Sequence, residues 1–316
     1  MTEPLVAVTG GTGFIGSHLV RLLHKQGWRI RILSRRLPLH PLLANSRFEV
    51  VIGDMGNQRS LHQLVKGCSL VIHAAGLVKA AKAEDFFRVN HQQTKTFAEI
   101  VRRECPQGRF IFISSLAARE KLSVYGLSKF CAEEDIKKLT GLQTTIIRSP
   151  AVYGEFDQEI LPLIKLVNKG FGLILGSTKS RFSLIHVHDL ARFIAHIAND
   201  PAAVHKSFEP DDGKKGGYLW IDIIHEISRI LHKKHLSVLR IPAWLLKGYA
   251  VLATMMQGVK PASINILGHG KIREILHSDW ICHFPEINWP KGWQPLIPLP
   301  DGLTRTITAY RQMGWL

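Results

Sequence analysis

The stretch Leu5–Gly16, which reads LVAVTGGTGFIG, decides how the rest of the chain is interpreted. Its first four residues are an unbroken apolar run before a glycine cluster, which is typical of a strand buried on both faces of a parallel sheet. Gly10, Gly13 and Gly16 follow, and the apolar periodicity of residues 17–23 predicts a helix directly after them. Glycines in such a strand-to-helix turn let the backbone approach a pyrophosphate at the helix N-terminus. The stretch predicts a dinucleotide site, with a plain glycine-rich loop as the alternative.

Length and composition predict one α/β domain with an appended lobe, because 316 residues, 46% of them hydrophobic, can bury a large core. The first strand starts so near Met1 that no secretory signal fits before it, so we expect a cytoplasmic protein. The cysteines show no metal-binding spacing, so we expect buried thiols and no metal site. These cysteines are Cys68, Cys105, Cys131 and Cys282.

The formal net charge of +16 creates a positive field that attracts phosphates, nucleic acid or an anionic bilayer. The basic residues are dispersed and are not interleaved with aromatic residues as on a nucleic-acid platform, so we expect no nucleic-acid partner. A solvated surface is the first interpretation, and peripheral attraction to an anionic membrane surface is the second.

The second strand of the predicted sheet bears on the choice of cofactor. Residues 29–33 alternate in hydropathy and lead into Ser34, Arg35 and Arg36. NAD-binding units place an acidic residue near this point, whereas an arginine suits the 2′-phosphate of NADP. The pair of arginines therefore favours NADP over NAD, with two solvated loop arginines as the alternative.

Three more apolar segments, residues 48–52, 70–72 and 109–113, predict further strands of the same sheet. The last of them brings Ser114 and Ser115 to the carboxyl edge of the sheet. Doubly wound folds bind their ligands at this edge.

Three polar side chains lie between or after these strands. Asp54 is expected to reach an adenine amino group or to cap the next helix. His73 is more typical of a packed histidine than of a catalyst, and small residues follow it that would let a cofactor lie flat. Asn90 lies in the helical segment 85–103 and is a candidate organiser of backbone or cofactor.

The segment Y-G-L-S-K places Tyr125 and Lys129 one turn apart on the same face of a predicted helix. A ketone that accepts a hydride develops negative charge on its oxygen, so it needs a proton donor and a further hydrogen bond. A nearby ammonium lowers the pKa of a phenol, and Ser115 is available for the second hydrogen bond. We predict that Ser115, Tyr125 and Lys129 are catalytic, with Tyr125 as the proton donor.

The chain resembles the extended form of the short-chain dehydrogenase/reductase superfamily over about its first 200 residues. The matching segments are T-G-G-T-G-F-I-G at Thr9–Gly16, Asp54, H-A-A-G at His73–Gly76, Asn90, S-S at Ser114–Ser115, Y-x-x-x-K at Tyr125–Lys129, I-I-R-S-P-A-V-Y-G at Ile146–Gly154 and R-F-S-L-I-H-V-H-D-L-A at Arg181–Ala191. The resemblance implies a nicotinamide-dependent oxidoreductase or epimerase with Ser115, Tyr125 and Lys129 as its triad.

The expected architecture is an α/β fold in which a Rossmann-type doubly wound parallel sheet is joined to a smaller substrate lobe that is discontinuous in sequence. The expected ranges are 1–150 with about 182–200 for the dinucleotide domain, and 151–181 with 201–316 for the lobe. The expected cofactor-binding residues are Gly10, Thr12, Gly13, Phe14, Ile15, Gly16, Ser34, Arg35, Arg36, Asp54, Met55, Ala74, Ala75, Gly76, Asn90, Tyr125, Lys129, Pro150 and Val152.

Two departures from sugar-nucleotide relatives bear on the substrate. Many of those relatives read R-x-x-N-V-Y-G-P, whereas this chain has Ala151 in place of the asparagine and Glu155 in place of the proline. The local sequence is more similar to the dihydroflavonol reductase and 3β-hydroxysteroid dehydrogenase branch. We therefore predict reduction of a ketone, or oxidation of the secondary alcohol, on a hydrophobic, lipid-like substrate. A nucleotide-sugar epimerase or dehydratase is the second hypothesis, and a non-catalytic dinucleotide-binding subunit or sensor is the third.

The C-terminal part adds expectations about the lobe. Residues 242–256 form an apolar helical segment shorter than the roughly 20 residues that cross a bilayer. It is expected to be buried or to present an adaptable apolar wall formed by Trp244, Tyr249, Met255 and Met256. Helices are also expected at 271–280 and 302–313, with Trp315 as a structural anchor. By analogy at the level of the fold, helices 85–103 and 125–139 could form a homodimer.

Overall fold

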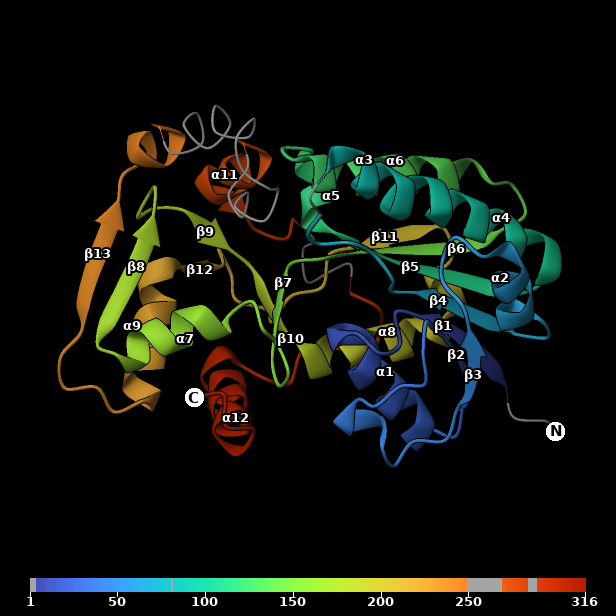
Figure 1. Ribbon diagram of the computed structural model, residues 1–316, viewed down its shortest axis with the longest axis horizontal. Helices are drawn as coiled ribbons and strands as arrows, with labels where there is room; N and C mark the ends of the chain where they lie inside the picture. Colours follow the sequence, from blue (N-terminus) through green and yellow to red (C-terminus); the bar gives the residue numbers. More distant parts are fainter. Residues whose placement is uncertain (1–3, 81, 249–268, 284–288) are drawn as a thin grey trace. The chain divides into compact units, whose positions relative to one another are not determined.

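The computed structural model describes residues 4–80, 82–248, 269–283 and 289–316, and the chain divides into two compact units (Figure 1). The first unit comprises Met1–Ser149, His188–Pro210 and Phe284–Gln294, and the second comprises Pro150–Val187, Asp211–His283 and Pro295–Leu316. Both units are therefore discontinuous in sequence. That the first takes a dinucleotide and the second a substrate stays a prediction.

A parallel sheet of seven strands, in the order β11-β6-β5-β4-β1-β2-β3, forms the centre of the first unit. The order runs outward from β1 in both directions, which confirms the doubly wound Rossmann-type fold and puts the switch point between β1 and β4. The strands are β1 Leu5–Thr9, β2 Arg29–Ser34, β3 Glu49–Ile52, β4 Leu70–His73, β5 Arg109–Ser115, β6 Gln143–Ser149 and β11 Lys206–Phe208.

Helices cover both faces of this sheet, which explains why every residue of β1 and β4 is buried. Side chains of α2, α4 and α6 pack on one face together with Phe110 and Phe112 of β5. Figure 1 shows α1 and α8 on the other face. These helices are α1 Phe14–Lys25, α2 Gln58–Val65, α4 Thr94–Glu104, α6 Val124–Lys138 and α8 Val187–Ala198.

The helix expected at residues 85–103 is interrupted. A short helix α3, Ala83–Phe86, is followed by a π-helical segment, Phe87–Gln93, and only then by α4. This π-helical segment contains Asn90, which is fully buried. π-Helical turns often mark functional positions, and the apolar periodicity of the sequence did not distinguish this turn from an α-helix.

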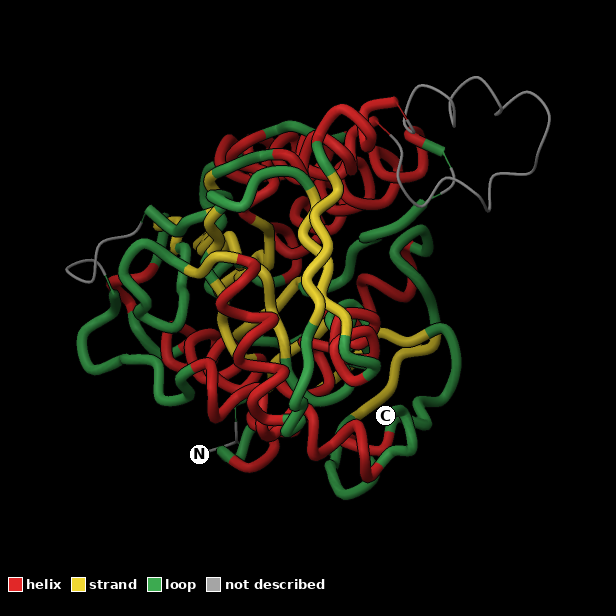
Figure 2. The backbone as a smooth tube through the Cα atoms, turned by 90° about the vertical axis from the view of Figure 1, so that its left-hand side faces the viewer, coloured by secondary structure: helices red, strands yellow, loops and turns green. Residues whose placement is uncertain are grey.

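The second unit consists of small sheets and helices around its own core. Strand β7 Ala151–Tyr153 pairs with β10 Leu184–His186, and β8 Phe171–Leu175 pairs with β13 Ser237–Ile241. Figure 2 shows β8 and β13 side by side at the front of the view. The remaining elements are β9 Arg181–Phe182, β12 Tyr218–Leu219, β14 Asp279–Trp280, α7 Leu161–Asn168, α9 Trp220–Ile230, α11 His269–Leu276 and α12 Leu299–Gln312.

The expected helix at 271–280 is wrong in its second half. Helix α11 ends at Leu276, and Asp279–Trp280 forms β14 beside β9. The indole nitrogen of Trp280 donates a hydrogen bond to the carbonyl of Glu274 at 2.9 Å, and the backbone of Ser183 bonds to Trp280 at 3.0 Å. These tertiary bonds turn the chain, and helical periodicity contains no information about them.

The expectations for the C-terminal helix and for the cysteines are confirmed in part. The C-terminal helix begins three residues earlier than predicted, and the Trp315 ring contacts the rings of Phe156 and Tyr310, as expected of an anchor. Cys131 is only partly buried, whereas the other three cysteines are buried as predicted.

The apolar segment 242–256 is described only as far as residue 248. Residues 243–248 are helical, with Trp244 exposed and Leu246 buried, while Tyr249, Met255 and Met256 lie outside the described residues. Among the helices that the structure describes, none is long and apolar enough to span a membrane.

Candidate active site

The turn after β1 brings three backbone segments so close together that only glycine fits. Gly10 has a φ of +70°, and a Cβ there would lie 2.7 Å from the backbone of Ala74 and Ala75. A Cβ on Gly16 would lie 2.0 Å from the carbonyl oxygen of Gly10. The glycine pattern therefore reflects contact between the carboxyl ends of β1 and β4 and the start of α1.

The start of α1 has the properties of an anion site. Gly13 is its N-cap and provides no side-chain hydrogen bond, and the first turn contains no acidic residue. The N–H groups of Phe14 and Ile15 have no acceptor within the helix, because the first turn of any helix lacks one. Together with the positive end of the helix dipole, this geometry fits a bound pyrophosphate.

His73 is packed, as predicted, and fixes the small-residue loop that follows β4. Thr9 Oγ1 accepts a hydrogen bond from the N–H of Ala75 at 3.3 Å and lies 2.6 Å from His73 Nδ1. His73 Nε2 lies 2.9 Å from Thr94 Oγ1. Burial, with a smaller contribution from Lys129, lowers the pKa of His73 to about 3, so the ring is neutral. A neutral ring that accepts from Thr9 at Nδ1 donates to Thr94 from Nε2.

Asn90 organises the backbone at the end of the same loop. Its Oδ1 accepts a hydrogen bond from the N–H of Leu77 at 2.7 Å, and its Nδ2 donates to the Leu77 carbonyl at 2.9 Å and to Ser128 Oγ at 3.3 Å. A Cβ on Gly76 would lie 3.0 Å from Lys129 Nζ. Asn90 therefore holds the loop against α6, which is the first of the two roles considered for it.

Lys129 is the most unusual group in this region because its ammonium is buried, with 4% of the residue exposed. Its Nζ donates a hydrogen bond to the carbonyl of Ile113 at 3.1 Å and lies 4.8 Å from the centre of the Phe112 ring. Burial lowers the pKa of Lys129 to about 8, although the negative charge of Glu133 acts in the opposite direction. A buried lysine with a perturbed pKa at a sheet edge is a candidate functional group.

An ion-pair network that sequence reasoning missed lies one helical turn beyond Lys129. Glu133 is fully buried; it accepts a hydrogen bond from Ser114 Oγ at 2.5 Å and is paired with Arg148, whose Nη2 lies 2.6 Å from Glu133 Oε2. A second pair of this network joins Glu209 and Arg119, with 2.7 Å between Glu209 Oε2 and Arg119 Nη1. The signal available in the sequence was an acid four residues after Lys129, on the same helix face.

Ser115 and Tyr125 begin two adjoining helices. Ser115 is the N-cap of α5, Leu116–Glu120, where its Oγ accepts a hydrogen bond from the N–H of Ala117 at 3.2 Å. Tyr125 lies in the first turn of α6, half-buried, with its ring 6.1 Å from that of Phe86. A Cβ on Gly126 would lie 2.2 Å from the carbonyl oxygen of Ala117, so the two helices touch there. All three predicted catalytic residues therefore belong to one packed assembly of β5, α5 and α6.

The remaining predicted site residues have varied environments. Asp54 does not cap α2, because its Oδ1 accepts the N–H of Gly56 at 2.8 Å while Asn57 caps that helix. Ser34 Oγ donates to the carbonyl of Arg36 at 2.6 Å. Thr12 is partly exposed, Met55 packs on the core, Arg35 and Arg36 are exposed, and Pro150 and Val152 belong to the second unit.

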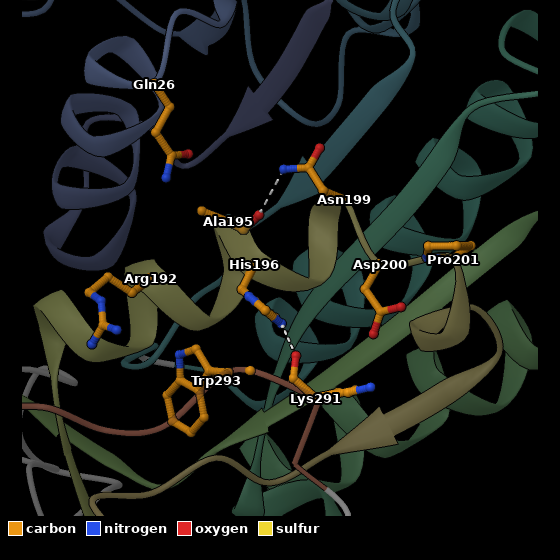
Figure 3. A pocket seen from close by; sticks show the side chains of 10 residues that line it. Gln26, Arg192, Ala195, His196, Asn199, Asp200, Pro201, Lys291 and Trp293 are labelled. Carbon is orange, nitrogen blue, oxygen red and sulfur yellow. Dashed lines mark hydrogen bonds between the residues drawn. The ribbon is translucent and has the colours of Figure 1, made fainter.

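A separate depression of about 550 Å³ lies in the first unit where α1 and α8 end (Figure 3). Two of its polar side chains hydrogen-bond to neighbouring backbone: His196 Nε2 donates to the carbonyl of Lys291 at 3.1 Å, and Asn199 Nδ2 donates to that of Ala195 at 3.4 Å. Because the helices end at the amino edge of the sheet, this depression is remote from the glycine turn. We assign it no part in the site.

Comparisons with known proteins agree with this geometry. The model of the NAD dependent epimerase/dehydratase family matches residues 6–209. A ceramide reductase of Caulobacter vibrioides is 40% identical over 314 residues, which cover 99% of this chain and 96% of that protein. A decarboxylating sterol-4-alpha-carboxylate 3-dehydrogenase of Mus musculus is 26% identical, and the alignment covers 97% of this chain and 91% of that protein.

Solved structures show the same fold along the whole chain. The crystal structure of gox2253 has a TM-score of 0.79 at 19% identity and covers 100% of both chains. A UDP-glucose 4-epimerase of Thermotoga maritima, solved with UDP-glucose, has a TM-score of 0.72 at 17% identity. The superposition covers 98% of this chain and 99% of the epimerase chain.

The buried ammonium predicts an unusual dependence of stability on pH. The folded-state pKa of Lys129, about 8, lies below the unfolded value of 10.5, so the unfolded state binds more protons between these values and stability rises with pH there. Replacing Lys129 by Met removes this contribution. We therefore compare the free energies of unfolding of the wild type and of Lys129→Met. The value for the wild type minus the value for the variant should increase by about 2 kcal/mol between pH 7 and pH 9.5.

Urea unfolding of both proteins at the two pH values measures this change. Lys138→Met is the matched control, because Lys138 lies on the same helix but is exposed. If the difference for Lys129→Met varies with pH no more than the difference for Lys138→Met, Lys129 is not desolvated.

Proposed function

The chain belongs to the NAD-dependent epimerase/dehydratase family, and we propose that it reduces the ketone of a 3-oxo ceramide to the secondary alcohol, with NADPH as the favoured cofactor. The family match and the relatives confirm the resemblance to extended short-chain dehydrogenases, and the chain is an NAD(P)-dependent oxidoreductase. The Ser-Tyr-Lys mechanism, the substrate and the preference for NADP are the proposal.

One observation carries the proposed reaction: the buried ammonium of Lys129 lies one helical turn from Tyr125, at the carboxyl edge of the sheet. A cation in this position favours phenolate over phenol, so it eases release of the Tyr125 proton to a nearby oxygen. Ser115, at the end of β5, supplies a second hydroxyl from the same edge. The three groups meet the needs of a carbonyl that becomes an alkoxide.

The residues of the glycine turn fit a dinucleotide. The space at Gly10 and Gly16 is closed to any side chain, and the N-terminus of α1 lacks a side-chain cap. When bound, the cofactor supplies the hydride that forms the new C–H bond at the ketone carbon. The Tyr125 hydroxyl gives its proton to the ketone oxygen, Ser115 donates a hydrogen bond to that oxygen, and Lys129 stabilises the phenolate left on Tyr125. The phenolate then regains a proton from solvent.

The substrate class is supported by similarity along nearly the whole chain. The Caulobacter relative is named a ceramide reductase, and the mouse relative is named a sterol dehydrogenase, so both names denote lipids. A simple ceramide has its secondary alcohol at carbon 3, which makes the 3-oxo compound the ketone to be reduced. Ala151, which stands where many sugar-nucleotide relatives have asparagine, also favours an apolar substrate over a sugar nucleotide.

The preference for NADPH is supported by Arg35 and Arg36 at the carboxyl end of β2. Both side chains are exposed, and neither forms an ion pair within the part of the chain that the structure describes. Two unpaired guanidinium groups at this position suit the extra 2′-phosphate of NADPH.

Tyr125→Phe tests the mechanism. Because the variant lacks only the phenolic oxygen, we expect the rate of reduction of a short-chain 3-oxo ceramide to fall about a hundredfold or more, while the dissociation constant of NADPH stays within about twofold. Loss of NADPH absorbance measures the rate, and fluorescence titration measures binding. A variant that reduces the ketone at the wild-type rate would contradict the role of Tyr125.

The double variant Arg35→Ser/Arg36→Ser tests the cofactor preference. Loss of the contacts to the 2′-phosphate should raise the dissociation constant of NADPH about tenfold or more and leave that of NADH nearly unchanged. Arg21→Ser/Lys25→Ser, which removes two exposed positive charges from α1, is the control for the change in net charge. Equal weakening of both cofactors would mean that the two arginines do not recognise the phosphate.

A further inference from the structure

Side-chain alternation in the β8–β13 sheet of the second unit defines an apolar face. The two strands run parallel, with Phe171 opposite Ser237 and Leu173 opposite Leu239. Because side chains alternate along a strand, one face of the sheet, which we call the outer face, carries five apolar residues. These residues are Phe171, Leu173, Leu175, Leu239 and Ile241.

The opposite face of the sheet is covered by α9. A Cβ on Gly172, whose neighbours on the strand point to the outer face, would lie 2.7 Å from Ile224 Cγ2 of that helix. Ile174, on the same side of the strand as Gly172, is buried in the core of the second unit. The outer face therefore points away from that core.

Two of the five apolar residues of the outer face are exposed. Leu246 and Ile272 pack against Leu175 and Ile241 at the carboxyl ends of the strands. Phe171, at the amino end of β8, is 55% exposed, and Leu239, in the middle of β13, is 65% exposed. The helical residues 243–248, which follow β13, add Trp244 at 70% and Leu245 at 45%. Figure 2 shows β8 and β13 at the front of the view. Large apolar side chains that are neighbours and are exposed to this degree are typical of an interaction surface.

Basic side chains lie near both ends of the outer face. A shallow depression at the amino ends of β8 and β13 is lined by Phe171 together with Lys169, Lys233 and Lys234, and none of the described residues that line it is acidic. None of the three lysines forms an ion pair among the residues that the structure describes. Lys247, exposed on the helical turn after β13, adds a further positive charge.

We propose that the outer face docks the protein on an anionic lipid bilayer. Exposed tryptophan, phenylalanine and leucine side chains enter the boundary between headgroups and acyl chains, while lysines reach anionic headgroups with their long stems. The net charge of +16 adds attraction to such a surface. This docking goes beyond the proposed function and rests on it only for the reason that docking is useful. A ceramide precursor resides in a membrane, so a docked enzyme meets its substrate there.

Two variants of the full chain test the proposal by flotation with phosphatidylcholine vesicles that contain phosphatidylglycerol. Phe171→Ser/Leu239→Ser removes apolar side chains, and Lys169→Gln/Lys233→Gln/Lys234→Gln removes charges. The wild type should bind anionic vesicles, bind less at high salt, and bind vesicles of pure phosphatidylcholine weakly. Each variant should lower the partition into anionic vesicles about tenfold or more.

Matched controls come from the first unit. Leu37→Ser/Leu39→Ser replaces side chains that are 70% and 93% exposed, and Lys25→Gln/Lys66→Gln/Lys138→Gln removes three exposed lysines. Neither control should change the partition by more than about twofold. Unchanged binding by both outer-face variants, or no binding of anionic vesicles by the wild type, would overturn the proposal. So would a dimer in sedimentation velocity that the Phe171→Ser/Leu239→Ser variant abolishes, because the face would then bind a second copy.

The reaction is measured separately, in detergent micelles with a short-chain 3-oxo ceramide. The outer-face variants should keep the wild-type rate there, which also shows that they fold. If the wild type binds anionic vesicles through this face but reduces no ketone, the docking stands and the proposed function fails.

Discussion

A single buried charge, the ammonium of Lys129, constrains the carboxyl edge of the main sheet. An ammonium that has lost its water must be surrounded by groups that stabilise it, and here these are the Ile113 carbonyl, the Phe112 ring and the nearby charge of Glu133. The loop at Gly76 closes against the same group because it has no side chain there. The strand end, the loop and the helix are therefore mutually positioned by one cation.

The ion pairs beside Lys129 connect its helix to the neighbouring strands. Glu133 is held by Arg148 of β6 and by Ser114 of β5, so the helix that carries Lys129 is fixed to two neighbouring strands. Removal of one partner from a buried ion pair typically costs about 3–5 kcal/mol, because the other charge stays buried without compensation. Ser115 directly follows Ser114, and Tyr125 lies on the same helix as Lys129 and Glu133, so both belong to the elements that these contacts join.

The sequence predicted features that depend on local residue patterns. The glycine turn, the strands of the doubly wound sheet and the helix that carries Tyr125 and Lys129 all have periodicities or fixed spacings, and the structure contains them. The sequence did not predict features that arise from contacts between distant segments. The π-helical turn at Asn90 depends on the loop at Leu77, and the strand at Trp280 depends on β9. The pairing of Glu133 with Arg148 joins residues that are 15 positions apart and show no motif.

The most direct test of the account follows the hydride itself. Purified enzyme is incubated with a 3-oxo ceramide and NADPH that carries deuterium at the transferring C4 position, and the product is analysed by mass spectrometry. If the chain transfers hydride from NADPH to the ketone, the product is a ceramide with one deuterium on carbon 3, together with an equal amount of NADP⁺. An unlabelled product, or cofactor that retains all its deuterium while the ketone is unchanged, would contradict it.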